Sequence, residues 1–106
     1  MAFSREQLPP SIRSGEAFEV RITFRHPMET GFRVDDVGKA IPRNVIREFV
    51  CRYNGTEVFR AKLGSGIAAN PYLRFPVVAR DSGELIFTWI DDAGERGDAR
   101  SEVIVG

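Results

Sequence analysis

The sequence has one cysteine, one histidine and no excess charge of either sign. One cysteine excludes an internal disulfide and a cysteine-based zinc site. No apolar run approaches about 20 residues, so no helix that could span a bilayer is predicted. The 15 basic residues balance the 15 acidic ones, so no net field attracts nucleic acid or an anionic membrane. We therefore expect neither a nucleic-acid partner nor membrane association.

The N-terminal segment, residues 1–18, has no hydrophobic stretch of the signal-peptide kind and no cleavage signature. By itself this favours the cytoplasm. The length predicts one domain over residues 1–106, large enough to bury a single core without disulfides or metals. The sequence contains no repeat, no phosphate loop and no dinucleotide fingerprint.

Short stretches of alternating apolar and polar residues predict strands rather than helices. Residues 17–25 alternate strictly, which is typical of a half-buried strand. Further strands are predicted at 72–78, where Pro76 indicates an edge or a bulge, and at 84–90 and 99–105. The proline-rich residues 8–12 are interpreted as an edge segment. About seven short strands separated by turn signals predict an all-β, immunoglobulin-like β-sandwich.

The strongest local signal is Asn54-Gly55, in the middle of residues 45–63, because this pair favours a hairpin. A two-residue turn would pair Tyr53 with Thr56 and set the apolar residues of the second strand against the polar face of the first. A three-residue loop that starts at Tyr53 would pair Arg52 with Thr56. We therefore predict the three-residue loop with a bulge. It places the apolar side chains of both strands on one face: Phe49, Cys51, Phe59 and Ala61.

Residues 27–44 lack a regular pattern, apart from a turn predicted at Val37-Gly38-Lys39. A connection of this length in a small domain is usually functional or mobile. Residues 27–31 and 67–73 carry Met, Ile, Tyr and Leu, which are unusual in solvent-facing loops. These side chains either plug the ends of the sandwich or form a partner surface, since Met and Tyr are enriched in interface cores.

Few residues suggest chemistry. His26, Met28 and Cys51 are ligand types of a blue-copper site, but such a site needs two histidines. His26 and Cys51 could form a nucleophile–base pair, yet a thiol on the apolar face of a strand is inert and has a raised pKa. Asp91 and Asp92 should diverge at a strand end, where turn chemistry explains them. We therefore predict no catalytic residue, no metal site and no cofactor.

Several short segments occur in an order that resembles the SoxZ family, the Z subunits of the SoxYZ thiosulfate-oxidation carrier. The resemblance covers about residues 12 to 105. The segments that carry it are His26-Pro27-Met28-Glu29-Thr30-Gly31, Ile41-Pro42-Arg43, Asn54-Gly55 with Glu57-Val58-Phe59, Ala69-Asn70-Pro71-Tyr72-Leu73, Ser82-Gly83, and Phe87-Thr88-Trp89 followed by Asp91-Asp92 and Gly94.

The resemblance implies an immunoglobulin-like subunit with no catalytic group, which pairs tightly with SoxY. In this family the sulfur intermediate is carried on a cysteine of the SoxY C-terminal arm, and the complex docks transiently to other Sox enzymes. The chain is then expected in the periplasm, exported with SoxY, which bears the twin-arginine signal. Whether the chain forms a homodimer when SoxY is absent is left open by the sequence. Cys51 is expected in the core.

We predict that the loop 27–31 and the segment 69–73 form part of the surface that faces SoxY or the enzymes it visits. A buried anchor at Met28 or Tyr72 would contribute about 2 kcal/mol or more to association. The alternative is a stand-alone immunoglobulin-like binding module that stays monomeric. The predicted partner-binding residues are His26, Pro27, Met28, Glu29, Thr30, Gly31, Asn70, Pro71 and Tyr72.

Overall fold

The computed structural model describes residues 3–26, 28–29, 31–64 and 69–106, and these residues contain strands and no helix, hence no helix long and apolar enough to cross a membrane. The predicted all-β sandwich of seven strands is confirmed. The strands are β1 (Phe3–Gln7), β2 (Ala17–Arg25), β3 (Ile46–Tyr53), β4 (Thr56–Lys62), β5 (Tyr72–Val78), β6 (Gly83–Asp91) and β7 (Arg96–Val103).

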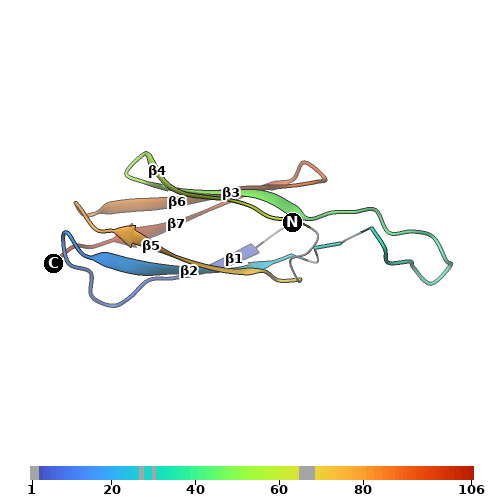
Figure 1. The fold of residues 1–106 in the computed structure, drawn as a ribbon, viewed down its shortest axis with the longest axis horizontal. Coiled ribbons are helices and arrows are strands. Elements are labelled where there is room, and N and C mark those ends of the chain that lie inside the picture. Colours follow the sequence, from blue (N-terminus) through green and yellow to red (C-terminus); the bar gives the residue numbers. More distant parts are fainter. Residues whose placement is uncertain (1–2, 27, 30, 65–68) are drawn as a thin grey trace.

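Two antiparallel sheets lie face to face (Figure 1). One has the order β1-β2-β5 and the other β4-β3-β6-β7. The predicted strands 17–25 and 72–78 are confirmed, and Pro76 lies on the edge strand β5, where its missing N–H interrupts no ladder.

Two predicted boundaries are wrong. The N-terminal edge strand ends at Gln7 rather than covering residues 8–12, because the prolines that follow cannot donate to the ladder. The last strand begins at Arg96 instead of residue 99 and ends at Val103. It begins early because the turn after Asp91 is tight, with Gly94 N–H donating to the Asp91 carbonyl over 3.0 Å. Ile90 therefore pairs with Arg96.

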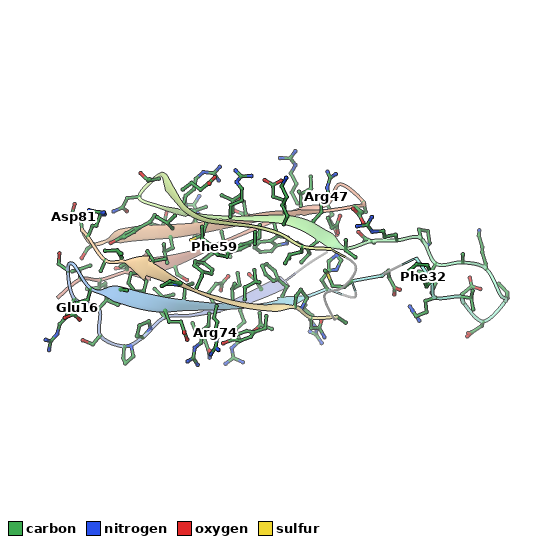
Figure 2. All side chains as sticks on the ribbon, viewed as in Figure 1. Glu16, Phe32, Arg47, Phe59, Arg74 and Asp81 are labelled. Carbon is green, nitrogen blue, oxygen red and sulfur yellow. The ribbon has the colours of Figure 1, made fainter. Side chains whose placement is uncertain are left out.

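The core lies between the sheets, where Phe24 contacts Phe49 and Trp89 edge-on at ring-centroid distances of 5.5 and 5.0 Å. On one side, Phe59 of β4 and Phe75 of β5 stack with centroids 4.0 Å apart, and Figure 2 shows Phe59 between the layers. Each such ring contributes roughly 1.5–3 kcal/mol by its burial. The central inward-facing residues are Phe18, Val20, Ile22, Phe24, Phe49, Cys51, Phe75, Val77, Leu85, Phe87, Trp89 and Val103.

The central hairpin closes with a two-residue turn. Asn54 and Gly55 have φ angles of 49° and 85°, the left-handed values that a type I′ turn requires at both positions. Tyr53 consequently pairs with Thr56. The predicted three-residue loop is therefore wrong.

The shared apolar face of this hairpin is nevertheless confirmed, because a bulge changes the register. Arg52 pairs with Glu57, but the next residue, Cys51, pairs with Phe59. Val58 is thus the extra residue, and it restores the register that puts both apolar sets on the core side. The bulge lies in the edge strand β4, where no second neighbour opposes it.

Residues 31–43 form an arm that projects beyond the end of the sandwich (Figure 1). The molecule measures 57 × 21 × 18 Å, whereas a nine-residue strand spans only about 30 Å. Within the arm, a bridge joins Val34 to Ala40, and Gly38 N–H donates to the Asp35 carbonyl over 3.0 Å. The turn predicted at residues 37–39 is confirmed.

Candidate partner-binding end of the sandwich

The arm exposes large apolar side chains. Phe32 is 91%, Val37 86% and Val34 58% exposed, and Phe32 is visible on the arm in Figure 2. Its tip is ordered by Asp35, whose Oδ1 accepts hydrogen bonds from the Val37 and Lys39 N–H groups at 3.0 and 2.9 Å. A shaped protrusion that carries three exposed apolar side chains is typical of a protein contact.

The base of the arm is fastened to the sandwich. Glu29 and Asn44 exchange two backbone hydrogen bonds of 2.8 Å. The Asn44 side-chain oxygen also accepts a hydrogen bond from Ala93 N–H at 3.2 Å. The Arg33 guanidinium donates to both carboxylate oxygens of Glu29, at 3.1 and 2.6 Å, and lowers the pKa of that carboxyl. The arm therefore leaves the body in a defined direction.

At the end of the sandwich from which the arm projects, His26 and Asp91 form a buried pair, and the two residues are 4% and 2% exposed. The Met28 N–H donates to His26 Nδ1 at 3.0 Å, so the proton of the neutral ring must be on Nε2. That N–H points to Asp91 Oδ2 at 3.2 Å, and Asp91 Oδ1 accepts a hydrogen bond from the Glu95 N–H at 2.9 Å. The pair joins the end of β2 to the end of β6.

Sequence reasoning missed this pair, although strand alternation contains the signal. His26 continues the inward series of β2, and Asp91 continues that of β6. The predicted divergence of Asp91 and Asp92 is confirmed, because Asp92 is exposed. Its Oδ2 accepts a hydrogen bond from Val45 N–H at 3.2 Å and lies 3.3 Å from Arg43 Nε.

Two residues of the predicted partner surface have left-handed backbones. Met28 has a φ of 50° and Asn70 a φ of 52°. The Met28 side chain is buried, and its sulfur accepts a hydrogen bond from the Ile46 N–H at 3.3 Å. Asn70 bonds His26 twice, through its side-chain oxygen at 3.0 Å and its N–H at 2.8 Å. These contacts close the end of the core.

The predicted partner-binding residues thus fall into two groups. His26, Met28 and Pro71 are buried, so Met28 is a core residue rather than a surface anchor in this conformation. Glu29 is half-buried, while Gly31, Asn70 and Tyr72 are exposed. Pro27 and Thr30 lie outside the described residues. Partner binding by these segments stays a prediction, and the apolar arm that follows Gly31 was not part of it.

Cys51 is a core residue, as predicted. Its side chain is fully buried, and desolvation raises the pKa of the thiol to about 12. Such a thiol is protonated and unreactive near neutral pH. Among the described residues, no three His, Cys, Asp or Glu side chains gather where they could hold a metal ion.

A family model described as "Sulphur oxidation protein SoxZ" matches residues 7–102, nearly the whole chain. The chain belongs to the SoxZ family. The resemblance found in the sequence is thereby confirmed, and the SoxZ match includes the arm and both strands that flank it. A comparison with curated proteins gave no match.

Solved structures similar to this SoxZ-family chain include the superoxide reductase (neelaredoxin) of Ignicoccus hospitalis, with 20% identity and a TM-score of 0.74 over 97% of this chain and 80% of that one. A putative superoxide reductase from Thermotoga maritima has 15% identity and a TM-score of 0.72 over 97% and 85%. At these identities the likeness shows a shared fold and carries no activity to the SoxZ-family chain.

Proposed function

We propose that this chain is the non-catalytic subunit of a SoxYZ sulfur carrier. It binds SoxY and holds it while a SoxY cysteine carries the sulfur intermediate. Membership of the SoxZ family over residues 7–102 supports this assignment. The environment of Cys51 also fits, because a buried thiol whose pKa is raised to about 12 is unsuited to carry cargo itself. The reactive sulfur then belongs to the partner.

The observation that carries the proposal is the arm. Burying a Phe or Val side chain contributes about 1.5–3 kcal/mol, but association costs roughly 4–15 kcal/mol in lost freedom. Burying Phe32, Val34 and Val37 would therefore do little more than offset that cost. We propose that SoxY also covers the base of the arm near Glu29 and Gly31, which would approach the roughly 800 Å² per partner of a stable interface.

The test is the affinity of purified chain for SoxY, measured by calorimetry. The double variant Phe32→Asp/Val37→Asp should bind at least 30-fold more weakly, as expected when about 2 kcal/mol is lost at an interface centre. Val78→Asp/Ile104→Asp is the matched control, because it introduces the same two carboxylates at side chains that are 50% and 69% exposed and lie outside the arm. Its affinity should stay within twofold of the wild type.

Two results would contradict the proposal. Equal SoxY affinity for the arm variant and the control would place the contact elsewhere. No binding of SoxY by the wild type would favour the stand-alone binding module, and size-exclusion chromatography of the chain without SoxY would then show a monomer. A homodimer in that experiment, lost on addition of SoxY, would instead fit a subunit whose partner surface is open.

We also propose a periplasmic location, because membership of the SoxZ family implies export together with SoxY. Replacing both signal arginines of SoxY by lysine should retain this chain in the cytoplasm, as shown by cell fractionation. Export of the chain without functional SoxY would disprove joint export.

A further inference from the structure

The outer face of the three-stranded sheet carries more positively than negatively charged side chains. Paired residues point to the same side of a sheet. Arg5 and Tyr72 therefore flank Thr23 on this face, and Arg74 lies beside Arg21. Arg25 is the next outward residue of β2. Figure 2 shows Arg74 pointing away from the sandwich. We call Arg5, Arg21, Arg25, Arg74 and Tyr72 the arginine face.

This arrangement is not neutralised within the described chain. The outward positions of β1, β2 and β5 include one acidic residue, Glu19, which pairs with Arg21 at 2.6 Å and raises the pKa of that guanidinium. Arg5, Arg25 and Arg74 have no ion-pair partner among the described residues. Like charges directly opposite on neighbouring strands, as at Arg21 and Arg74, are destabilising.

On the outer face of the four-stranded sheet, by contrast, arginines pair with glutamates. There Arg60 pairs with both Glu48 and Glu57, and Arg100 lies 3.4 Å from Glu84. The whole chain has a formal charge of zero. The positive charge on the arginine face is thus a local segregation and not a consequence of a basic composition.

The arginine face also contains a hollow and an aromatic ring. The hollow, of about 450 Å³, is lined by Ser4, Arg5, Thr23, Phe24 and Arg25, and no carboxylate lines it. Asn70 lines it too, and since the Asn70 Oδ1 is bonded to His26 N–H, its amide nitrogen is left to donate. Tyr72 is 51% exposed. Arginine and tyrosine, with tryptophan, are enriched among the residues that dominate the binding energy of protein interfaces.

We propose that the arginine face is a docking surface for an acidic protein partner. Carboxylates of that partner would pair with Arg5, Arg25 and Arg74, and an apolar side chain would pack on Tyr72. The acidic Glu19 and the aromatic Tyr72 favour a protein surface over a uniformly anionic polymer or bilayer. This surface covers the flat of a sheet, whereas the SoxY contact is proposed at the arm, and the two adjoin where β2 ends at Arg25.

Exposed charges of this kind steer encounters and speed association, and salt screens them. A carrier that visits several enzymes in turn needs rapid, reversible contacts of this type. The use of the arginine face for visits to several enzymes rests on the proposed function, whereas the segregation of charge does not.

The test uses ¹⁵N-labelled full chain, alone and bound to SoxY, titrated with the acidic dodecapeptide (Glu-Asp-Tyr)₄. The amides of β1, β2 and β5 should shift, and raising NaCl from 50 to 300 mM should weaken binding at least tenfold. Arg25→Glu/Arg74→Glu should weaken binding at least tenfold. The matched control is Arg47→Glu/Arg96→Glu, which changes net charge equally at exposed positions outside the arginine face, and it should retain binding within threefold.

Several outcomes would overturn the proposal. Equal losses in both double variants would show a general charge effect. Identical shifts with sodium sulfate at matched ionic strength would show a small-anion site only, and binding to phosphatidylglycerol vesicles without peptide binding would show a lipid site. A tenfold loss of SoxY affinity in Arg25→Glu/Arg74→Glu would assign the face to SoxY. If instead the peptide binds as expected while SoxY does not bind at all, the proposed function fails and the docking surface stands.

Discussion

At the scale of single residues, the buried pair of His26 and Asp91 allows a sharp prediction. Asp91→Ala removes the carboxylate that accepts hydrogen bonds from the buried His26 Nε2–H and from the Glu95 N–H. A buried donor without an acceptor costs about 1–3 kcal/mol. We expect the free energy of unfolding in urea to fall by that amount. The control Asp36→Ala, on the exposed arm, should change it by less than about 0.5 kcal/mol. Equal values for both variants would contradict a stabilising role of the pair.

Cys51 gives a prediction about alkaline stability. Burial raises the pKa of its thiol to about 12 in the folded state, whereas an unfolded cysteine has a pKa of about 8.5. Above the lower value the unfolded chain loses the proton that the folded chain keeps, so stability falls as the pH rises.

Between pH 8 and pH 10 the wild type should therefore lose about 2 kcal/mol more than Cys51→Ala, which has no thiol to ionise. The measurement is urea unfolding of both proteins at each pH, because the difference between them cancels the titration of other groups. Parallel losses in the two proteins would show that the thiol ionises as readily in the folded state as in the unfolded one.

The same residues show what sequence reasoning could and could not predict locally. Alternation correctly placed Cys51 inside, and it also contained the inward positions of His26 and Asp91. Their pairing was not predictable, because the two lie 65 residues apart and meet only through the packing of two sheets. For Met28 the sequence left open whether the side chain plugs the end of the sandwich or lies on a partner surface, and the structure shows a left-handed backbone with the side chain in the core.

At the scale of elements, the strand alternation was strong enough to predict β2 and β5 with their observed bounds. The hairpin of β3 and β4 was harder. The apolar residues of both strands share one face only if the hairpin contains one extra residue, and the prediction placed that residue in the turn. The structure places it at Val58, because Asn54-Gly55 satisfies a type I′ turn unaided and an edge strand accommodates a bulge.

The pairing of β6 with β7 gives a prediction about Gly97, which lies opposite Trp89. A Cβ at Gly97 would overlap the indole ring, so Gly97→Ala must displace a core side chain. We expect the free energy of unfolding to fall by about 1–3 kcal/mol, as for other overpacked cores. The emission of Trp89, the only tryptophan in the sequence, should shift.

Gly64→Ala is the control for this substitution, since an added methyl there meets no described atom within 4 Å. It should leave both the emission spectrum and the unfolding curve close to those of the wild type. An unchanged Trp89 spectrum in Gly97→Ala would mean that the ring does not cover Gly97 in solution.

At the scale of the whole molecule, the chain is a β-sandwich with an arm that projects from one end. The core explains the fold class that the sequence predicted. The arm was recognised only as a long irregular connection, because its single bridge, between Val34 and Ala40, and its exposed Phe32 leave no alternating pattern. Residues that contact another chain need not follow the burial pattern of their own chain. Periodicity therefore could not reveal the proposed contact surface of the arm.

This division predicts that the arm can be removed without loss of the fold. The backbone of Arg43 lies within van der Waals reach of a methyl group built on Gly31, so residues 32–42 can be replaced by Asn-Gly, a two-residue turn. Residues 31–40 are all exposed, and the bridge between Glu29 and Asn44 remains. The free energy of unfolding in urea should stay within about 1 kcal/mol of the wild type.

The shortened chain should at the same time lose at least 30-fold in affinity for SoxY, because the exposed apolar side chains are gone. Binding of the acidic peptide should persist, since the arginine face lies on β1, β2 and β5. A loss of more than about 2 kcal/mol of stability would show that the arm belongs to the core. Undiminished SoxY affinity would show that the sandwich alone forms the partner surface.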